Sequence, residues 1–161
     1  MTATDAAAPG TRERVAANTA AEVNERIRRQ TEASLCYFAE HPEEIAHRLA
    51  ELDGEWDIER LLEANAASFT LAGLVLGVVS GRQWLVLPTA VAGFLLQHAV
   101  QGWCPPLPVF RRLGIRTARE IEAERYALKC LRGDFSAAMD ATLSARERAR
   151  RALASVVGAG A

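Results

Sequence analysis

The chain has 161 residues, of which 50% are hydrophobic and 24% are charged, with 19 basic and 20 acidic side chains. This length predicts one domain of ordinary size, and the near-neutral charge gives no reason to expect nucleic acid as a partner. The charges are unevenly placed, because the 47 residues from Ala64 to Phe110 contain one formal charge, on Arg82. This distribution excludes an ordinary amphipathic soluble fold for the middle of the chain.

The first ten residues, MTATDAAAPG, lack the basic and apolar regions of a secretory signal peptide and are expected to be a disordered tail. Residues 11–57 follow as an acidic stretch, with a charged helix up to residue 40 and a second helix that starts at residue 42. The second helix has one apolar face, made by Ile45, Leu49, Leu52 and Trp56. Such a face beside a membrane predicts a helix that lies in the interface. Asp57 is expected to cap the helix that follows.

Residues 58–117 are predicted to form a transmembrane helical hairpin with two spans, within an all-α fold. The first apolar run reaches from Leu61 to Ser80 and the second from Trp84 to Trp103. About 20 helical residues cross the roughly 30 Å of hydrocarbon. The alternative is a pair of core helices in a soluble bundle, but the charged flanks are poorly suited to cover two helices that are apolar on all sides. We therefore expect the lipid bilayer to be the partner of this segment.

Basic residues near the membrane ends predict the orientation of the hairpin. Those next to the two outer ends are Arg48, Arg60, Arg111, Arg112, Arg116 and Arg119. The turn between the spans holds only Arg82. The excess predicts a multi-pass protein with both termini in the cytoplasm.

Small residues recur every four positions in both spans, and this spacing lets membrane helices approach closely. They are Gly73, Gly77 and Gly81 in the first span, and Thr89 and Gly93 in the second. Such stripes can seal the hairpin or join two chains, and the sequence leaves both open. We prefer a homodimer, because two helices alone offer little protein interior.

Polar side chains gather near the end of the second span, where Gln97, His98 and Gln101 are followed by Cys104. Spacings of four and three put Gln97, Gln101 and Cys104 on one helical face. Interhelical hydrogen bonds are the favoured role for these groups, with ligand binding as the alternative. The three cysteines are far apart and are expected to be free thiols, so neither a metal site nor a cofactor is predicted.

Beyond the second span, the prolines after Cys104 predict a rigid exit, followed by a short turn that Gly114 stops. Residues 118–155 are expected to form basic cytoplasmic helices, the first opened by a capping box at Thr117 and Glu120. Asp134 is predicted to cap the last helix, and residues 156–161 to form a disordered tail. Four arginines in the last helix indicate a solvated face or, as the alternative, contact with anionic lipid.

The segment from Gly102 to Thr117 resembles the YgaP-type inner-membrane domain, a two-helix bacterial family of unknown function that sometimes accompanies a rhodanese (sulfurtransferase) domain. The family's mark is a Cys-Pro at the cytoplasmic end of the second helix and a Leu-Gly-Ile segment after it. Cys104-Pro105 and Leu113-Gly114-Ile115 match this mark. The resemblance covers residues 58–117 and implies topology in the bacterial inner membrane and dimerisation, but no reaction, because the rhodanese active loop is absent.

Three functions are compared, of which a channel or transporter is the weakest, because two helices with one polar cluster offer no evident pathway without higher oligomers. The first is a non-enzymatic dimerising anchor or scaffold, since the sequence contains no recognised catalytic constellation. The second is a sulfur, persulfide or redox relay through Cys104 with a rhodanese-type partner, in which Arg111 and Arg112 would lower the pKa of the thiol. On a continuous helix His98 would lie about 120° away from Cys104, a poor position for a base. We therefore favour the anchor.

Overall fold

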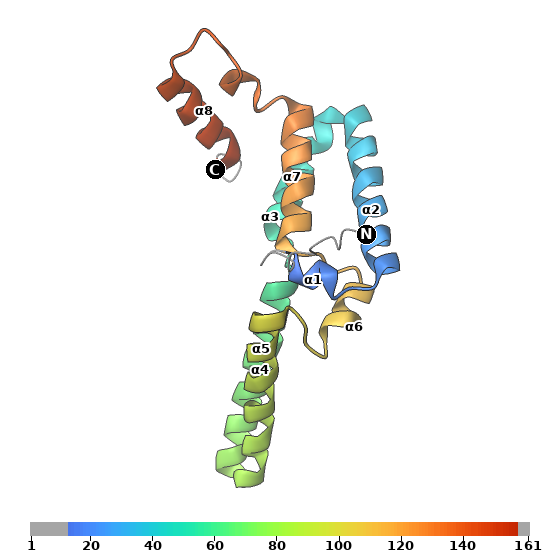
Figure 1. The fold of residues 1–161 in the computed structure, drawn as a ribbon, viewed down its shortest axis with the longest axis vertical. Helices are drawn as coiled ribbons and strands as arrows, with labels where there is room; N and C mark the ends of the chain where they lie inside the picture. The colour runs from blue at the N-terminus through green and yellow to red at the C-terminus, as the bar shows by residue number, and fades with distance from the viewer. Residues whose placement is uncertain (1–12, 158–161) are drawn as a thin grey trace, which may run out of the picture. The chain divides into compact units, whose positions relative to one another are not determined.

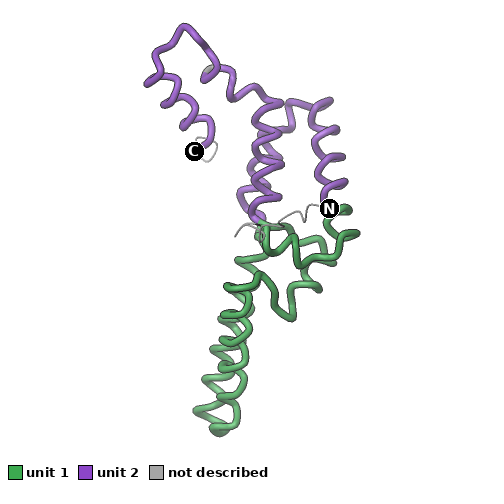
Figure 2. Tube along the Cα trace, in the orientation of Figure 1, with its two compact units in different colours: residues 1–26, 56–117 green, residues 27–55, 118–161 purple. Residues whose placement is uncertain are grey.

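The computed structural model describes residues 13–157, and within this range the chain forms helices and turns without any strand (Figure 1). The prediction of an all-helical chain is therefore confirmed for these residues. The chain divides into two compact units (Figure 2): unit 1 contains residues 1–26 and 56–117, and unit 2 contains residues 27–55 and 118–161. The tail expected at residues 1–10 lies outside the described range.

Unit 1 contains the hairpin and the short helices at its base. Its elements are α1 (Arg14–Ala17), the start of α2 (Ala21–Glu40), α4 (Ile58–Val79), η2 (Arg82–Leu85), α5 (Val86–Gln101) and α6 (Leu107–Arg112). Helices α4 and α5 lie side by side along the hairpin (Figure 1). The base of the hairpin is the end where α4 begins and α5 ends.

Helix α4 begins where the sequence predicts, because the Asp57 carboxylate accepts a hydrogen bond from the Arg60 amide at 2.7 Å. Its 22 residues span about 33 Å. At the tip of the hairpin Gly81 has a φ of +125°, a backbone conformation that favours glycine. The 20 residues from Arg82 to Gln101 then return over a similar length, of about 32 Å. Both arms are long enough to cross the hydrocarbon of a bilayer.

The apolar side chains of the hairpin are largely uncovered. Two helices are long and apolar enough to span a membrane, and only 11% and 6% of their most apolar windows are buried. Val78, Val79 and Val86 are 86%, 79% and 71% exposed. No other helix of the described residues covers this apolar surface.

A small core closes the base of the hairpin. It consists of Val15, Ile58, Leu62, Cys104 and Leu107, with Phe110 and Ile115 packed against it. Helix α6 begins at Leu107, inside the proline-rich stretch that the sequence predicts as a rigid exit, because Pro108 fits the first turn of a helix. The expected stop is present, since the helix ends at Arg112 and Gly114, with a φ of +88°, follows Leu113. This core joins the start of α4 to α1, to α6 and to the segment that follows α5.

Unit 2 is a separate helical cluster. Its elements are the rest of α2, η1 (Pro42–Glu44), α3 (Ile45–Gly54), α7 (Ala118–Arg132), η3 (Ser136–Ala138) and α8 (Ala145–Val157). Its core contains Ile45, Leu49 and Leu52 of α3 together with Ile121 and Leu128 of α7. The apolar face of α3 is therefore covered by protein, and it is not available to the membrane interface, where the sequence pattern placed it. Trp56, the fourth predicted member of this face, lies beyond the end of α3 and is 48% exposed.

A buried carboxylate connects three helices of unit 2. Glu124 on α7 is fully buried. It accepts a hydrogen bond from the Ser34 hydroxyl at 2.7 Å and from the Arg48 guanidinium at 3.0 and 3.3 Å. Because an ion is costly to bury without such partners, this contact fixes how α2 and α3 pack on α7.

The predicted cap of the last helix is wrong. Asp134 accepts two hydrogen bonds from the Arg132 guanidinium, at 2.7 and 2.6 Å, and this charge-assisted contact occupies its carboxylate. Helix α8 starts later, where the Ser144 hydroxyl accepts a hydrogen bond from the Glu147 amide at 3.2 Å. The helix then continues to Val157, two residues into the predicted tail.

Candidate functional site

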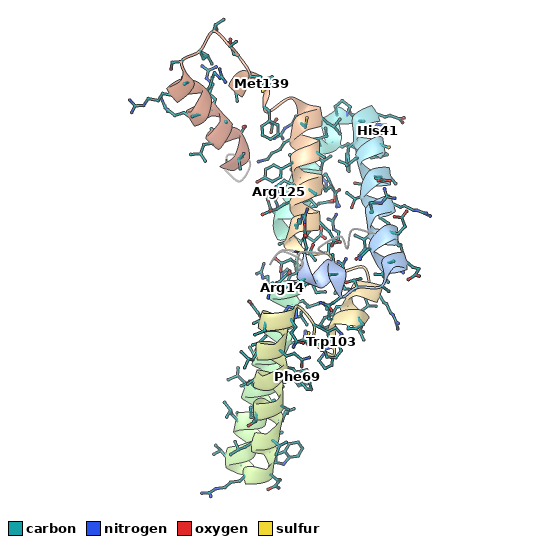
Figure 3. The ribbon with its side chains drawn as sticks, in the orientation of Figure 1. Arg14, His41, Phe69, Trp103, Arg125 and Met139 are labelled. Atoms are coloured by element: carbon teal, nitrogen blue, oxygen red, sulfur yellow. The ribbon has the colours of Figure 1, made fainter. Side chains whose placement is uncertain are left out.

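Helix α1 caps the end of α5 at the base of the hairpin. The Arg14 guanidinium donates hydrogen bonds to the carbonyl oxygens of Ala99 and Val100, both at 2.8 Å. The Asn18 amide donates to the carbonyl oxygen of Gln101 at 3.0 Å. The last carbonyls of a helix have no partner within it, and a cation there is stabilised by the helix dipole. Figure 3 labels Arg14 in this position.

Gly102 is required by this capping contact. Its φ is +73°, and a Cβ atom added to it would lie 2.4 Å from the Arg14 Cβ and 3.0 Å from the Arg14 carbonyl carbon. Helix α5 therefore ends at Gln101 in a left-handed glycine, the most common way for helices to stop. The apolar run predicts a helix that continues to Trp103, but the structure ends it two residues earlier, at Gln101. Gly102 is the local signal for this end, whereas no local pattern indicates the contact with α1.

Arg111 is a buried side chain of α6 that ties the base together. Its guanidinium donates to the Thr19 hydroxyl at 3.2 Å, to the Asn24 amide oxygen at 2.9 Å and to the Ile115 carbonyl oxygen at 3.0 Å. Its role is therefore to hold α6 against the connection between α1 and α2, rather than to activate a thiol.

The Cys104 thiol is buried in the core at the base. Burial raises its pKa above the ordinary value, and the Leu107 amide offsets this only in part. The expectation that Arg111 and Arg112 lower this pKa is wrong, because desolvation of the thiolate dominates. Since the thiolate is the reactive form, the environment does not favour the relay hypothesis.

A cavity of about 430 Å³ lies between the two arms near the base. The side chains that line it include Asn65, Phe69, Phe94, His98 and Cys104. Most of the lining is apolar, so the cavity can accept an apolar group. Phe69, which α4 contributes to the lining, is labelled in Figure 3. His98 and Cys104 line the same cavity although a continuous helix would separate them, because α5 ends at Gln101 and the chain turns at Gly102.

The imidazole of His98 is the one polar ring in the lining of this cavity. Its Nδ1 atom is buried and has no hydrogen-bond partner among the described residues. The Asn65 amide nitrogen donates to the carbonyl oxygen of Leu61, four residues back on the same helix, at 2.9 Å. The polar side chains that this cavity offers to a bound group are therefore the His98 imidazole, the Cys104 thiol and the Asn65 amide, whose nitrogen is already engaged.

The small residues of the two spans differ in what they pack against. A Cβ atom at Gly73 would lie 2.5 Å from the Pro88 Cδ, and one at Gly77 would lie 2.6 Å from the Leu85 Cδ2. These two glycines therefore seal α4 against the other arm, while Gly81 forms the tip. A Cβ atom at Gly93 would have no neighbour within 4 Å.

Thr89 and Gly93 belong to a longer stripe on α5. Residues 89, 93, 97 and 101 are each four apart, so they follow one side of the helix. Thr89, Gly93 and Gln101 are exposed and Gln97 is half-buried. The Gln97 amide reaches the Gln101 amide oxygen at 3.5 Å, a long contact that leaves hydrogen-bonding capacity on both side chains. Cys104 is not on this face, because it follows the end of α5 and is buried.

Unit 2 contains one cluster that the sequence analysis did not single out. His41, Glu43 and Glu44 place possible metal-ligand atoms within 4.8 Å of one another. The Tyr37 hydroxyl donates to the Glu44 carboxylate, at 3.1 and 3.2 Å to its two oxygens. Both glutamates are exposed, and surface acids of this kind are common without an ion, so the cluster carries no metal assignment.

No family model matches the chain, and neither a curated protein nor a solved structure matches it. The resemblance to a YgaP-type domain therefore depends on the sequence of residues 58–117.

Proposed function

We propose that this protein is a dimerising anchor of the bacterial inner membrane, whose hairpin spans the bilayer and holds the helices of unit 2 on the cytoplasmic side. Two membrane-length arms with uncovered apolar side chains support the insertion. The excess of arginines at the base over the single Arg82 at the tip supports the orientation. The role is that of a scaffold for a partner, without chemistry of its own.

The observation that carries the dimer is the stripe formed by Thr89, Gly93, Gln97 and Gln101. Its small members leave space for a second helix at the backbone of α5, as in small-residue contacts between membrane helices. Its glutamines would otherwise face hydrocarbon with hydrogen bonds unmade, which is costly. A second copy of α5 would fill the space at the small residues and would pair with the glutamine amides, because it carries the same small residues and the same amides.

The mass of the purified complex tests this proposal. The expected species in a mild detergent is about 35 kDa, twice the 17.5 kDa of one chain. Gly93→Ile places a branched side chain on the open backbone and should give a monomer. Gln97→Leu removes a hydrogen bond of about 0.6–2 kcal/mol and should weaken the dimer about threefold to thirtyfold.

Val79→Ile is the matched control, because Val79 is 79% exposed on the other arm and lies outside the stripe. This variant should remain dimeric. A wild-type chain that stays monomeric at every concentration contradicts the proposal, as does a dimer that survives Gly93→Ile. A rhodanese-type protein that copurifies with the wild-type chain would identify the partner that the resemblance implies.

A further inference from the structure

Helix α8 is the most exposed helix of unit 2. Every residue from Ala145 to Val156 is exposed except Glu147 and Ser155, which are half-buried. Leu153 is 65% exposed, and Met139, labelled in Figure 3 before the helix, is 80% exposed. A partner that removes such apolar side chains from water would gain free energy by doing so.

The exposed side chains of α8 separate into an apolar arc and a basic border. At about 100° per residue, five apolar side chains fall within an arc of about 100°. They are Ala145, Ala149, Ala152, Leu153 and Val156. Arg146 and Arg148 fall on opposite edges of this arc, so cations border the apolar face on both sides.

Helix α8 is strongly basic. It contains four arginines and one acidic residue, Glu147, which gives a net charge of +3. Glu147 accepts hydrogen bonds from Arg150 at 3.3 Å and from Arg151 at 3.2 Å. Among the described residues Arg146 and Arg148 have no ion-pair partner, and they border the apolar arc.

A buried lysine fixes the orientation of this helix within unit 2. The Lys129 ammonium group, from α7, donates to the carbonyl oxygens of Ser155 and Val156 at 3.0 and 2.8 Å. A cation at these last carbonyls satisfies free acceptors and stabilises the helix dipole. The half-buried Ser155 is about 110° from the middle of the apolar arc, so this contact leaves the arc free.

We propose that α8 docks on an anionic lipid surface, with the apolar arc in the interface and the bordering arginines on lipid phosphates. Charge complementarity identifies the occupant, because each basic residue near an anionic leaflet strengthens binding roughly fivefold. An amphipathic helix of this composition is typical of those that lie in the membrane interface. This inference depends on the proposed function, which brings unit 2 to the cytoplasmic leaflet through the hairpin.

Hydrogen exchange of the full-length chain in nanodiscs tests the inference. The nanodiscs contain phosphatidylcholine alone or phosphatidylcholine mixed with phosphatidylglycerol. The α8 peptide should exchange about 25-fold more slowly with phosphatidylglycerol present, because the two bordering arginines, at roughly fivefold each, then contact the surface. The protection should disappear at about 1 M salt, where the screening length is about 3 Å.

Variants of α8 test the bordering arginines and the apolar arc separately. Arg146→Gln with Arg148→Gln removes the bordering cations and should abolish the difference between the two lipids. Leu153→Ser removes the largest apolar side chain of the arc and should reduce the protection. The matched control is Glu147→Gln, which changes one charge of the same helix in the opposite sense and should retain or increase protection.

The same experiment distinguishes failure of this inference from failure of the proposed function. If the hairpin is in the membrane, the peptides of α4 and α5 remain protected in both lipids. Equal exchange of α8 in both lipids, with a protected hairpin, overturns the docking inference alone. Protection that rises with protein concentration in neutral lipid also overturns it, because a second copy then covers the arc. Rapid exchange of α4 and α5 overturns the anchor itself.

Discussion

Replacing Gly73 by alanine should destabilise the hairpin more than the same change at Gly77 or at Gly93. The added Cβ would lie 2.5 Å from the Pro88 Cδ, 3.2 Å from the Leu87 Cβ and 3.3 Å from the Pro88 nitrogen. A proline ring and a backbone atom cannot move aside without separating the two arms. Overpacking of this kind costs about 2–3 kcal/mol.

The net effect also includes the helix propensity of alanine, which favours the substituted chain by about 1 kcal/mol. The expected loss for Gly73→Ala is therefore about 1–2 kcal/mol. For Gly77→Ala the nearest atom is the end of the flexible Leu85 side chain, which can rotate, so the loss should be close to zero. For Gly93→Ala, where nothing lies within 4 Å, the hairpin should be unchanged or slightly more stable.

The assay is a titration of sodium dodecyl sulfate into dodecylmaltoside micelles that contain the full-length chain, followed by circular dichroism and tryptophan fluorescence. It is performed at a dilution where the chain is monomeric, so that a dimer contact at Gly93 does not contribute to the measured stability. The order of stability should be Gly93→Ala, then Gly77→Ala, then Gly73→Ala. If Gly73→Ala is as stable as Gly93→Ala, the close packing of α4 on Pro88 is refuted.

Three further predictions follow from the base of the hairpin and from unit 2. Gly102→Ala should destabilise the chain by about 3 kcal/mol or more in a thermal melt. The left-handed backbone alone costs an alanine about 1–2 kcal/mol, and the new Cβ atom would overlap α1. An unchanged melting temperature would refute the capping contact. Arg48→Met should cost about 3 kcal/mol, because it removes the guanidinium that donates two hydrogen bonds to the buried Glu124 carboxylate, and an unchanged stability would contradict the importance of this contact. Because burial raises the pKa of Cys104, its alkylation by iodoacetamide at pH 7 should be at least about tenfold slower than that of the two exposed cysteines. Its rate should still rise above about pH 8.5, where an ordinary thiol has begun to level off; equal rates at pH 7 would contradict the buried location.

The elements that the sequence predicts well are those coded by short stretches. The apolar runs define both arms, and the carboxylate of Asp57 needs only the amide of Arg60 to start α4. The proline at position 42 begins η1, and Gly114 follows α6, as local turn chemistry requires. These signals depend on backbone sterics and hydrogen bonds within a few residues, so no tertiary information is needed.

The contacts that the sequence does not predict connect distant segments. Periodicity shows that Ile45, Leu49 and Leu52 share an apolar face, but not that α7 covers it. In the same way, a stripe of small residues shows that close approach is possible, but not which helix approaches. Gly73 meets the other arm while Gly93 meets nothing in its own chain. The cap of α5 by Arg14 joins residues 85 positions apart, and no local rule encodes such a pair.

Membrane extraction of the full-length chain tests the central claim most directly, because all that is proposed depends on hydrocarbon being the environment of α4 and α5. Membranes from bacteria that express the chain are washed with alkaline carbonate and then treated with detergent. The chain should remain in the pellet after carbonate and be released only by detergent. A chain that instead leaves the pellet in carbonate, and stays monomeric in buffer without detergent, would contradict the account.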